Sequence, residues 1–354
     1  MIKKISKFLS IPPVITLFSN QSDHIDRKIS QTDQKRLFHN ILSYHDGLLL
    51  AGTTGYGPML NDGQYRDLIA LALNLKKSTF TEKLIFIGAI AVSKAKVKAL
   101  IKNAVAVEEK CILPGQGGID AFVVSPQSFF YRQTQAEIIA AMKDIAKFAA
   151  CFKKAIFLYN ISRSGALLKP ETIQILKKVP NIVGIKDSSG DYSLYKKYLA
   201  FQDHDFKVFQ GKPQFDLQTF ADKGDGIVDA NANFAPTLMK AVLDFYQQGE
   251  LKKARELHER VYDATRYLNH KHSMIAENRL ASRIAQLYLL DMIDYLPVLL
   301  ERSELQQIAQ GLTRNRIPKF SIQDGIIKPN TVFTMGDYQE KIDKIEKFVS
   351  MAQS

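Results

Sequence analysis

The chain has 354 residues, of which 46% are hydrophobic and 24% charged, a length and composition that predict a soluble globular protein with one barrel-sized domain and an appendage. The formal net charge is +12, but the basic residues are spread thinly and form no basic run interleaved with aromatic side chains, as a nucleic-acid platform requires. We therefore expect no nucleic-acid partner, and we interpret the charge as a solvated surface that favours an acidic substrate.

Three further features bear on the compartment. The only cysteines are Cys111 and Cys151, which leaves no disulfide framework and no CxxC zinc pattern and is typical of a reducing cytoplasm. No run approaches the roughly 18 apolar residues of a membrane span. Lys7 and the pair Pro12-Pro13 interrupt the basic N-terminus before the apolar core of a signal peptide forms. We expect a cytoplasmic protein that does not bind membranes.

From the N-terminus onward, short apolar runs alternate with longer segments of helical periodicity, which is the pattern of a βα-repeat fold with a parallel sheet. Eight such runs precede residue 231, and this number favours an α/β fold of the TIM (β/α)8 barrel type. No GxGxxG motif follows the first run, which argues against a dinucleotide-binding sheet. The predicted strands lie near Pro13–Phe18, Gly47–Gly52, Leu84–Ile90, Ala121–Ser125, Ala155–Tyr159, Ile182–Lys186, Phe206–Gln210 and Gly226–Ala230.

The helical segments carry their apolar residues on one face, as expected for helices packed outside a barrel. Within the barrel they are Gln34–Leu42, Gly63–Lys76, Lys94–Glu108, Gln135–Phe148 and Pro170–Lys177. The later ones are Thr237–Gln248, Leu251–Leu268, Ser273–Leu290, Glu301–Gly311 and Tyr338–Met351. We predict a catalytic barrel over residues 1–236, a C-terminal helical subdomain packed on it over residues 237–318, and a tail over residues 319–354 that begins irregularly and ends in a helix.

Lys186 is the most unusual residue of the predicted barrel. It ends the apolar run Ile182–Lys186, where an ammonium group in low dielectric must find a partner or lose its proton. A neutral amine is a nucleophile, which makes Lys186 a candidate Schiff-base lysine. Taken alone, a lysine at a strand end more often pairs with a carboxylate, such as that of Asp187.

Other polar motifs end other predicted strands, and in a TIM barrel the carboxyl ends of the strands share one active face. The turn Gly52-Thr-Thr-Gly55 ends the second strand and is suited to bring amides and hydroxyls to a carboxylate. Tyr159-Asn160 ends the fifth strand, and Gly226-Ile227 with the Asn231–Asn233 turn marks the eighth. Each motif alone fits an ordinary turn or a core-edge aromatic residue, but together they predict one constellation.

These motifs, in this order, resemble the dihydrodipicolinate synthase and N-acetylneuraminate lyase superfamily of pyruvate-dependent class I aldolases. The resemblance covers roughly residues 12–300 and includes the stretches Gly184–Asp191 and Gly226–Pro236. It implies that Lys186 forms an imine with a 2-oxo acid such as pyruvate, and that Tyr159 shuttles protons at the reacting atoms. It further implies the following roles: carboxylate binding by Thr53, Thr54 and Gly55, with Thr54 also in the proton relay; binding of the second substrate by Arg163; and a backbone contact from Ile227.

The chain departs from this family pattern at four places. Tyr56 and Gly57 follow Gly55, where the family has Glu, and Asp229 replaces a common Ser. The family's tyrosine pair after the fourth strand is replaced by Gln127 and Ser128, which leaves Tyr131 as a displaced substitute for the second relay tyrosine. The segment from Tyr159 to Gly165 lacks one residue, a proline, relative to the synthases, and this shortening would shift Arg163.

We therefore interpret the chain as a Schiff-base-forming (class I) aldolase or lyase that makes or cleaves a carbon–carbon bond with pyruvate, acting on a 2-oxo-3-deoxy acid. The partners are then pyruvate and an aldehyde, and the resemblance implies a homotetramer. The alternatives are a 4-hydroxy-tetrahydrodipicolinate synthase and a non-catalytic paralogue that binds 2-oxo acids. No metal or other cofactor is expected, and the His270-Lys-His272 spacing is interpreted as structural.

Overall fold

The computed structural model describes residues 7–19, 28–113, 116–127, 133–266, 276–293, 300–323, 326–332 and 334–352. They fall into two compact units. The first unit contains Met1–Val14 and His45–Ala230, and the second contains Ile15–Tyr44 and Asn231–Ser354. Residues 15–44, which we expected within the barrel portion, thus group with the C-terminal helices.

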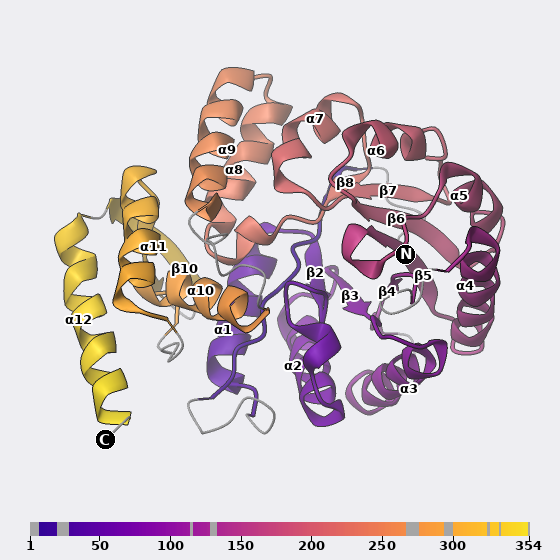
Figure 1. Cartoon of the computed structure of the whole chain (residues 1–354), viewed down its shortest axis with the longest axis horizontal. Helices are drawn as coiled ribbons and strands as arrows, with labels where there is room; N and C mark the ends of the chain where they lie inside the picture. Colours follow the sequence, from indigo (N-terminus) through magenta and orange to yellow (C-terminus); the bar gives the residue numbers. More distant parts are fainter. Residues whose placement is uncertain are drawn as a thin grey trace. The chain divides into compact units, whose positions relative to one another are not determined.

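The first unit is built on eight parallel strands that follow one another around a barrel (Figure 1). The ring closes because β8 pairs with β1 and the segment after β1 reaches β2, where the Leu49 N–H donates to the Pro12 carbonyl at 2.8 Å. The predicted TIM (β/α)8 fold is confirmed. The strands are β1 Leu9–Ser10, β2 Gly47–Leu50, β3 Leu84–Gly88, β4 Ala121–Val124, β5 Ala155–Ile161, β6 Ile182–Ser188, β7 Lys207–Gln210 and β8 Gly226–Ile227.

The first predicted strand was wrong in position. We expected it at Pro13–Phe18, whereas β1 is Leu9–Ser10 and only Pro13 makes a further parallel bridge, to Leu49. Pro12 and Pro13 have no N–H to donate, so the continuous ladder ends before them. The alternating apolar residues Leu9 and Ile11, which precede the prolines, supply the interior side chains of this strand.

Helices surround these strands within the first unit (Figure 1). Several begin with side-chain caps that satisfy free N–H groups: Asn61 and Gln64 form a capping box on α2, and Thr134 and Glu137 form one on α4. The helices α6 and α7, of eight and six residues, were not found by sequence analysis. The set comprises α2 Asp62–Thr79, α3 Lys94–Cys111, α4 Gln135–Ala150, α5 Pro170–Leu176, α6 Tyr192–Leu199 and α7 Asp216–Ala221.

The interior of the barrel is filled by inward-facing apolar side chains of successive strands. The rings of Phe86, Phe157 and Phe209 stack or tilt against one another, with centroids 4.8–6.3 Å apart. Gly184 faces Phe157, and a Cβ on this residue would lie 2.4 Å from the ring, so a side chain there would displace the core. Because apolar side chains fill this part of the barrel, the carboxyl ends of the strands are the place for polar chemistry.

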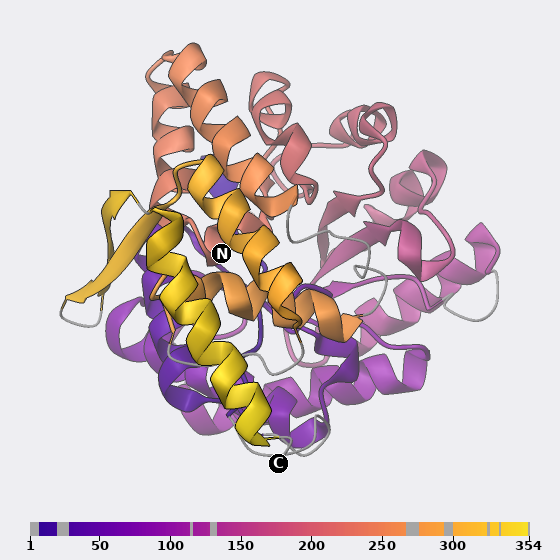
Figure 2. The same cartoon turned by 60° about the vertical axis from the view of Figure 1, so that its left-hand side comes forward.

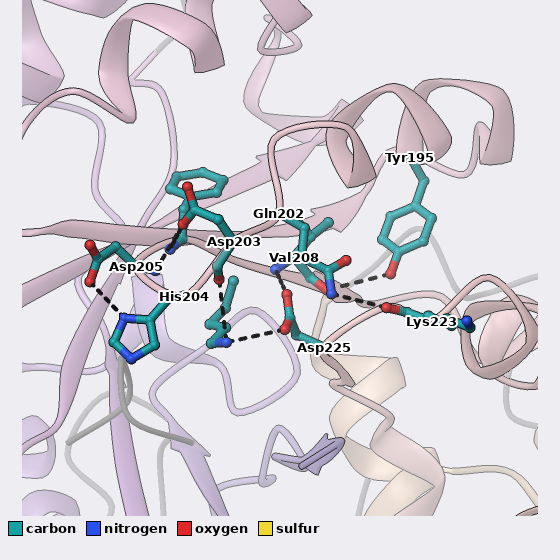
Figure 3. Close-up of polar contacts among 10 residues, drawn as sticks. Tyr195, Gln202, Asp203, His204, Asp205, Val208, Lys223 and Asp225 are labelled. Carbon is teal, nitrogen blue, oxygen red and sulfur yellow. Dashed lines mark hydrogen bonds and ion pairs between the residues drawn. The ribbon is translucent and has the colours of Figure 1, made fainter. Parts of the chain in front are cut away.

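Polar contacts fix the opposite end of the barrel, where β7 begins (Figure 3). The Asp225 carboxylate accepts a hydrogen bond from the Val208 N–H at 2.8 Å and pairs with the Lys207 amine at 3.4 Å. Burial raises the pKa of Asp225, and the bond from Val208 and the Lys207 charge oppose that rise. Asp203 caps the preceding turn by accepting from the N–H groups of Asp205 and Phe206. This network ties β7 to β8 by charge and backbone bonds.

A second buried ion pair joins α2 to the segment before β4. The Lys76 amine, which is 0% exposed, lies 2.8 Å from the Asp120 carboxylate and also donates to the Gly118 carbonyl at 2.9 Å. Replacing Asp120 with asparagine leaves a buried ammonium without its counter-charge, so we expect a loss of about 3–5 kcal/mol in the free energy of unfolding. Chemical denaturation measures this change.

The matched control is Asp62→Asn, which removes one partner of the exposed Lys96–Asp62 pair. It should lower the unfolding free energy by less than about 1 kcal/mol. Equal effects of the two substitutions would contradict the importance of the buried Lys76–Asp120 pair.

The second unit is mainly helical. Its members contact one another in series: α1 with α8, α8 with α9, α9 with α11, and α11 with α10 and α12. Figure 2 shows the yellow α12 beside α11. The helices are α1 Gln31–Tyr44, α8 Pro236–Gln247, α9 Leu251–Arg266, α10 Ala276–Leu289, α11 Arg302–Arg314 and α12 Met335–Ala352.

The start of the predicted tail is regular, not irregular as expected. Strands β9 Pro318–Gln323 and β10 Ile326–Val332 form an antiparallel hairpin, with Ile326 opposite Gln323. Pro318 opens β9, and Pro329 and Asn330 lie within β10. Proline and asparagine are rare inside strands, which hid this hairpin from a reading by composition. No helix among the described residues is long and apolar enough to cross a membrane.

Candidate active site

The centre of the site is the pair Tyr159 and Lys186 on neighbouring strands. The two residues are register partners in the β5–β6 ladder, and both strands run two residues beyond their predicted ends, to Ile161 and Ser188. Both side chains face the barrel interior, where the Lys186 Nζ lies 4.2 Å from the centroid of the Tyr159 ring. Lys186 is 5% exposed and Tyr159 is 2% exposed. An amine is thus held in a nearly dry site against a phenol.

The electrostatic setting of Lys186 differs from that of the other buried lysines. Lys76 and Lys207 each have an aspartate partner, at 2.8 and 3.4 Å. Across the described ranges of the chain, no carboxylate forms an ion pair with Lys186, and its near neighbour is the Tyr159 ring face. The sequence suggested Asp187 as a pairing partner, but alternation along β6 places that carboxylate on the other side of the strand. The amine is therefore left available for chemistry.

The turn after β2 brings a hydroxyl to the phenol. The Thr53 Oγ1 lies 3.2 Å from the Tyr159 hydroxyl, and either group can donate. The turn is wound tightly on Gly52, whose carbonyl accepts from the N–H groups of Gly55 and Gly57 at 3.1 and 2.9 Å. Thr53 is exposed and Thr54 is half-buried. The Thr53 hydroxyl is thus held beside the Tyr159 phenol by the turn that follows β2.

The residues that depart from the family pattern in this turn have a structural role. Tyr56 adopts a left-handed conformation with φ of 63°. A Cβ on Gly57 would lie 1.7 Å from the Ala51 carbonyl oxygen, so only glycine fits there. Tyr56 and Gly57 therefore complete a close-packed turn without the glutamate.

Sequence analysis missed Gly211, which follows β7 beside the amine. A Cβ at this position would lie 2.7 Å from the Lys186 Cε and 2.2 Å from the Ser188 Oγ. The Gly211 N–H donates to the Asp187 carbonyl at 2.7 Å, and its own carbonyl accepts from the Ser188 hydroxyl at 3.2 Å. Gly211 therefore makes room for the lysine side chain. A glycine directly after a predicted strand was the available signal.

The end of β4 adds two buried polar groups. Ser125 continues the inward alternation of Ala121 and Val123, and its carbonyl accepts from the Gln127 Nε2 at 2.6 Å. Within the described part of the chain, the Ser125 hydroxyl and the Gln127 Oε1 make no hydrogen bond. Tyr131 and Ser128 lie outside the described residues, and so do His270 and His272. The proposed substitution of a relay tyrosine by Tyr131 stays a prediction.

The remaining predicted residues lie in different settings. Arg163 belongs to the 3-10 turn η3 Ser162–Ser164 and its side chain is exposed. The Ile227 carbonyl accepts from the Ile11 N–H at 3.0 Å, as part of the β8–β1 ladder. The next residue, Val228, belongs to the interior cluster, which makes it a further candidate for the pocket wall. Among the described residues, no group of three or more His, Cys, Asp or Glu side chains could hold a metal ion.

Asp229, which replaces the family serine, forms a buried acid pair with Asp216 of α7. Both residues are 2% exposed. Burial raises the pKa of Asp216 well above its ordinary value of 3.8, and the negative charge of the neighbouring Asp229 raises it further. We therefore interpret Asp216 and Asp229 as a pair that shares a proton.

A raised folded-state pKa makes Asp216 destabilising as the pH increases. The unfolded chain loses this proton near pH 4, whereas the folded chain retains it, so stability falls as the pH rises above about 4. Asparagine at position 216 has nearly the same shape as aspartate but does not ionise. We expect a gain of roughly 1–3 kcal/mol in unfolding free energy at pH 7 that disappears toward pH 4. Urea denaturation across this pH range measures the gain.

Asp203→Asn provides the opposite control. Burial raises the pKa of Asp203, but the hydrogen bonds from Lys177 and from the N–H groups of Asp205 and Phe206 outweigh this effect and lower the pKa overall. Its contribution to stability is therefore present at neutral pH and is lost on acidification. A stabilisation by Asp216→Asn that persists unchanged at pH 4 would contradict the shared-proton interpretation.

Comparisons with known proteins agree with this geometry. The model of the Dihydrodipicolinate synthetase family matches residues 9–282. A 4-hydroxy-tetrahydrodipicolinate synthase of Listeria monocytogenes is 28% identical over 222 residues, which cover 62% of this chain and 70% of the relative. The synthase of Methanopyrus kandleri is 28% identical over 250 residues, covering 70% and 77% of the two chains.

Solved structures share the fold. Dihydrodipicolinate synthase from Bacteroides thetaiotaomicron superposes with a TM-score of 0.74 at 20% identity, covering 88% of this chain and 99% of that one. N-acetylneuraminate lyase from Aliivibrio salmonicida gives a TM-score of 0.72 at 19% identity, with 88% and 98% covered. Because the family match spans most of the sequence, the chain belongs to the dihydrodipicolinate synthetase family, a family of pyruvate-dependent class I aldolases and lyases.

Proposed function

We propose that Lys186 is the nucleophile that forms an imine with the keto carbon of pyruvate or of a pyruvate-derived 2-oxo acid. The observation that carries this proposal is the setting of its amine: buried, 4.2 Å from the Tyr159 ring, and without a carboxylate partner among the described residues. A buried amine that is not held by an ion pair is free to be directed at a bound keto carbon, as a Schiff-base lysine must be.

The residues around the amine have assigned roles in this proposal. Thr53, Thr54 and the Gly55 backbone bind the substrate carboxylate, and the Thr53–Tyr159 hydrogen bond of 3.2 Å links that carboxylate site to the phenol. Tyr159 carries protons, with Thr54 assisting. Arg163 binds the distal carboxylate of the second substrate by a bidentate contact. Ile227 borders the imine through its backbone.

The reaction balances in the cleavage direction as follows. The Lys186 amine adds to the keto carbon, water leaves, and a protonated imine results. The bond between C3 and C4 breaks, its electron pair moves into the imine to give an enamine, and the C4 hydroxyl proton passes through the Tyr159 hydroxyl as the aldehyde departs. Protonation at C3 and hydrolysis release pyruvate and restore the amine. Synthesis is the same path in reverse.

We propose a 2-oxo-3-deoxy acid as the aldol substrate, on the sequence Lys-Asp-Ser-Ser-Gly-Asp of residues 186–191, which begins inside β6 and continues past its end. A second candidate is 4-hydroxy-tetrahydrodipicolinate synthesis, which is favoured by the names of the relatives at 28% identity. A panel of 2-oxo-3-deoxy acids, assayed for pyruvate release, and a parallel assay with pyruvate and aspartate semialdehyde separate the two. Binding of pyruvate without turnover of either substrate would indicate the non-catalytic paralogue.

Reduction with sodium borohydride in the presence of pyruvate tests the imine directly. We expect one reduced pyruvate adduct, mapped by peptide mass spectrometry to the peptide that contains Lys186. Lys76 and Lys207, which are buried but ion-paired, serve as internal controls and should stay unmodified. An adduct on another lysine, or none at all, would overturn the proposal.

Two further assignments belong to this proposal. We propose a homotetramer, which light scattering of the purified protein tests. We also place the protein in the cytoplasm, in keeping with its two cysteines, Cys111 and Cys151, which are both free thiols. Fractionation of the source cells tests that placement.

A further inference from the structure

A hydrogen-bonded network lies behind the catalytic pair, on the outer side of β5 and β6. Its members are Asn160, Asp187, Tyr198 and the backbone of Leu168, and we call it the outer network. Asn160 follows Tyr159 and Asp187 follows Lys186, so strand alternation turns these two side chains away from the barrel interior. Each residue of the catalytic pair thus has a direct chain neighbour in the network.

Asn160 is the hub of the outer network and is 0% exposed. Its Nδ2 donates to the Asp187 Oδ1 at 2.7 Å and to the Tyr198 hydroxyl at 3.0 Å. Its Oδ1 accepts from the Leu168 N–H at 2.9 Å. Both amide hydrogens and the amide oxygen are therefore used. Because Asn160 and Asp187 are register partners, their bond clamps β5 to β6 one residue beyond the rung that holds Tyr159 and Lys186.

Asp187 connects the clamp to the turn after β6. Its carboxylate accepts from the Ser189 hydroxyl at 2.9 Å and from the Ser189 N–H at 3.3 Å. Burial raises the pKa of Asp187, and the bonds from Asn160 and Ser189 oppose the rise. The Asp187 carboxylate thus holds the side chain of Asn160 and both the backbone and the side chain of Ser189. It does not provide a counter-charge for the Lys186 amine.

The other half of the outer network fixes the segment between residues 160 and 168. The Tyr198 hydroxyl donates to the Leu168 carbonyl and accepts from Asn160, while the Leu168 N–H returns to Asn160. This closed ring ties the two ends of the segment together. Ser164 braces its middle by donating to the carbonyls of Ile161 and Ala166 at 2.8 and 3.1 Å. Arg163 lies inside the braced segment.

We propose that the outer network is a positioning device with two separable outputs. The Asn160–Asp187 bond sets the distance between the Lys186 amine and the Tyr159 ring, and so controls imine formation. The Tyr198–Leu168 bond sets the segment that carries Arg163, and so controls binding of the second substrate. This proposal rests on the proposed function and assigns three positioning residues that do not themselves touch the substrate.

The first output is tested with Asn160→Ala and with the near-isosteric Asp187→Asn. A displacement of about 1 Å between reacting groups can lower a rate 100-fold. We expect both variants to slow borohydride trapping of pyruvate on Lys186 and to lower kcat by about 10- to 100-fold, with KM for pyruvate changed less than about threefold, because Thr53 and the turn after β2 are untouched. Asp187→Asn keeps the shape but replaces the carboxylate acceptor of Asn160 with a weaker neutral amide oxygen, so it weakens the clamp and covers the case in which Asn160→Ala does not fold.

The second output is tested with Tyr198→Phe, which removes only the hydroxyl. We expect the trapping rate with pyruvate to stay at the wild-type value, whereas KM for the second substrate rises about tenfold or more, the worth of about one hydrogen bond to a charged group. The matched control is Tyr192→Phe on the same helix, whose hydroxyl donates to the Asp222 carboxylate at 2.9 Å and, within the described part of the chain, forms no hydrogen bond with a member of the outer network. It should change neither quantity.

The outcomes separate the two proposals. Wild-type trapping rates and kcat in both Asn160→Ala and Asp187→Asn would overturn the positioning role while leaving Lys186 as the nucleophile. A uniform loss in all variants, Tyr192→Phe included, would also overturn it, because general loosening of the fold would then explain the result. Absence of any pyruvate adduct on Lys186 in the wild-type protein would instead refute the proposed function.

Discussion

Replacing Lys186 with alanine is expected to abolish turnover, with kcat lowered by at least about a thousandfold. The imine needs a nitrogen nucleophile at this point, and the other lysines that are buried in the described structure, Lys76 and Lys207, are held by Asp120 and Asp225. Borohydride trapping with pyruvate should disappear in the same variant. Pyruvate release from the best aldol substrate gives kcat, and peptide mapping gives the loss of the adduct.

The informative control is Lys186→Arg. A guanidinium can lie on the Tyr159 ring as the amine does, but it stays protonated, so it cannot act as a nucleophile. We expect it to be as inactive as Lys186→Ala. Its thermal unfolding midpoint should not fall more than a few degrees below that of the wild type. Substantial turnover in Lys186→Arg would mean that charge, not nucleophilicity, is what this position supplies.

The strands of the barrel were predictable because burial on both faces leaves a local signature. Runs such as Leu84–Gly88 and Ala155–Ile161 are apolar almost without interruption, and this property survives in the sequence whatever the register. β1 was misplaced because the ladder ends at Pro12 and Pro13, while the apolar character continues to Phe18. Hydrophobicity identifies a buried segment, but hydrogen-bond donors decide where a strand ends.

The site was predictable only where a residue type is odd for its surroundings. Lys186 in an apolar run and two threonines between Gly52 and Gly55 met that condition. Both lie beside Tyr159, because the Lys186 amine contacts its ring and the Thr53 hydroxyl contacts its phenol. Gly211 and the outer network did not. Asn160 and Asp187 directly follow the predicted ends of their strands and are ordinary residues there, and their partnership depends on the β5–β6 register, which no local pattern fixes.

The settings of two aspartates could not be read from the sequence. Asp187 is next to Lys186 in sequence, where a lysine at a strand end more often pairs with a carboxylate, yet strand alternation sends the two side chains to opposite faces. Asp216 comes to Asp229 from a six-residue helix that sequence analysis did not find. The barrel thus places the Asp187 carboxylate, although it is next to the amine in sequence, on the outer side of β6.

Replacing Tyr159 with phenylalanine should separate imine formation from bond cleavage. The ring remains beneath the Lys186 amine, so borohydride should still trap pyruvate at close to the wild-type rate. The hydroxyl that bonds Thr53 is lost, and with it the path for the C4 hydroxyl proton, so kcat for cleavage should fall by about 100- to 10,000-fold. Exchange of the pyruvate C3 protons with deuterated water, followed by NMR, should slow in parallel, because enamine formation also needs the relay.

The matched control is Tyr65→Phe, which changes a buried tyrosine whose hydroxyl donates to the Gly88 carbonyl at 3.3 Å. It should leave all three measurements near wild type. If Tyr159→Phe kept kcat within about threefold of the wild type, a group other than this phenol would have to carry the proton, because general acid–base catalysis of this step contributes about 100-fold or more.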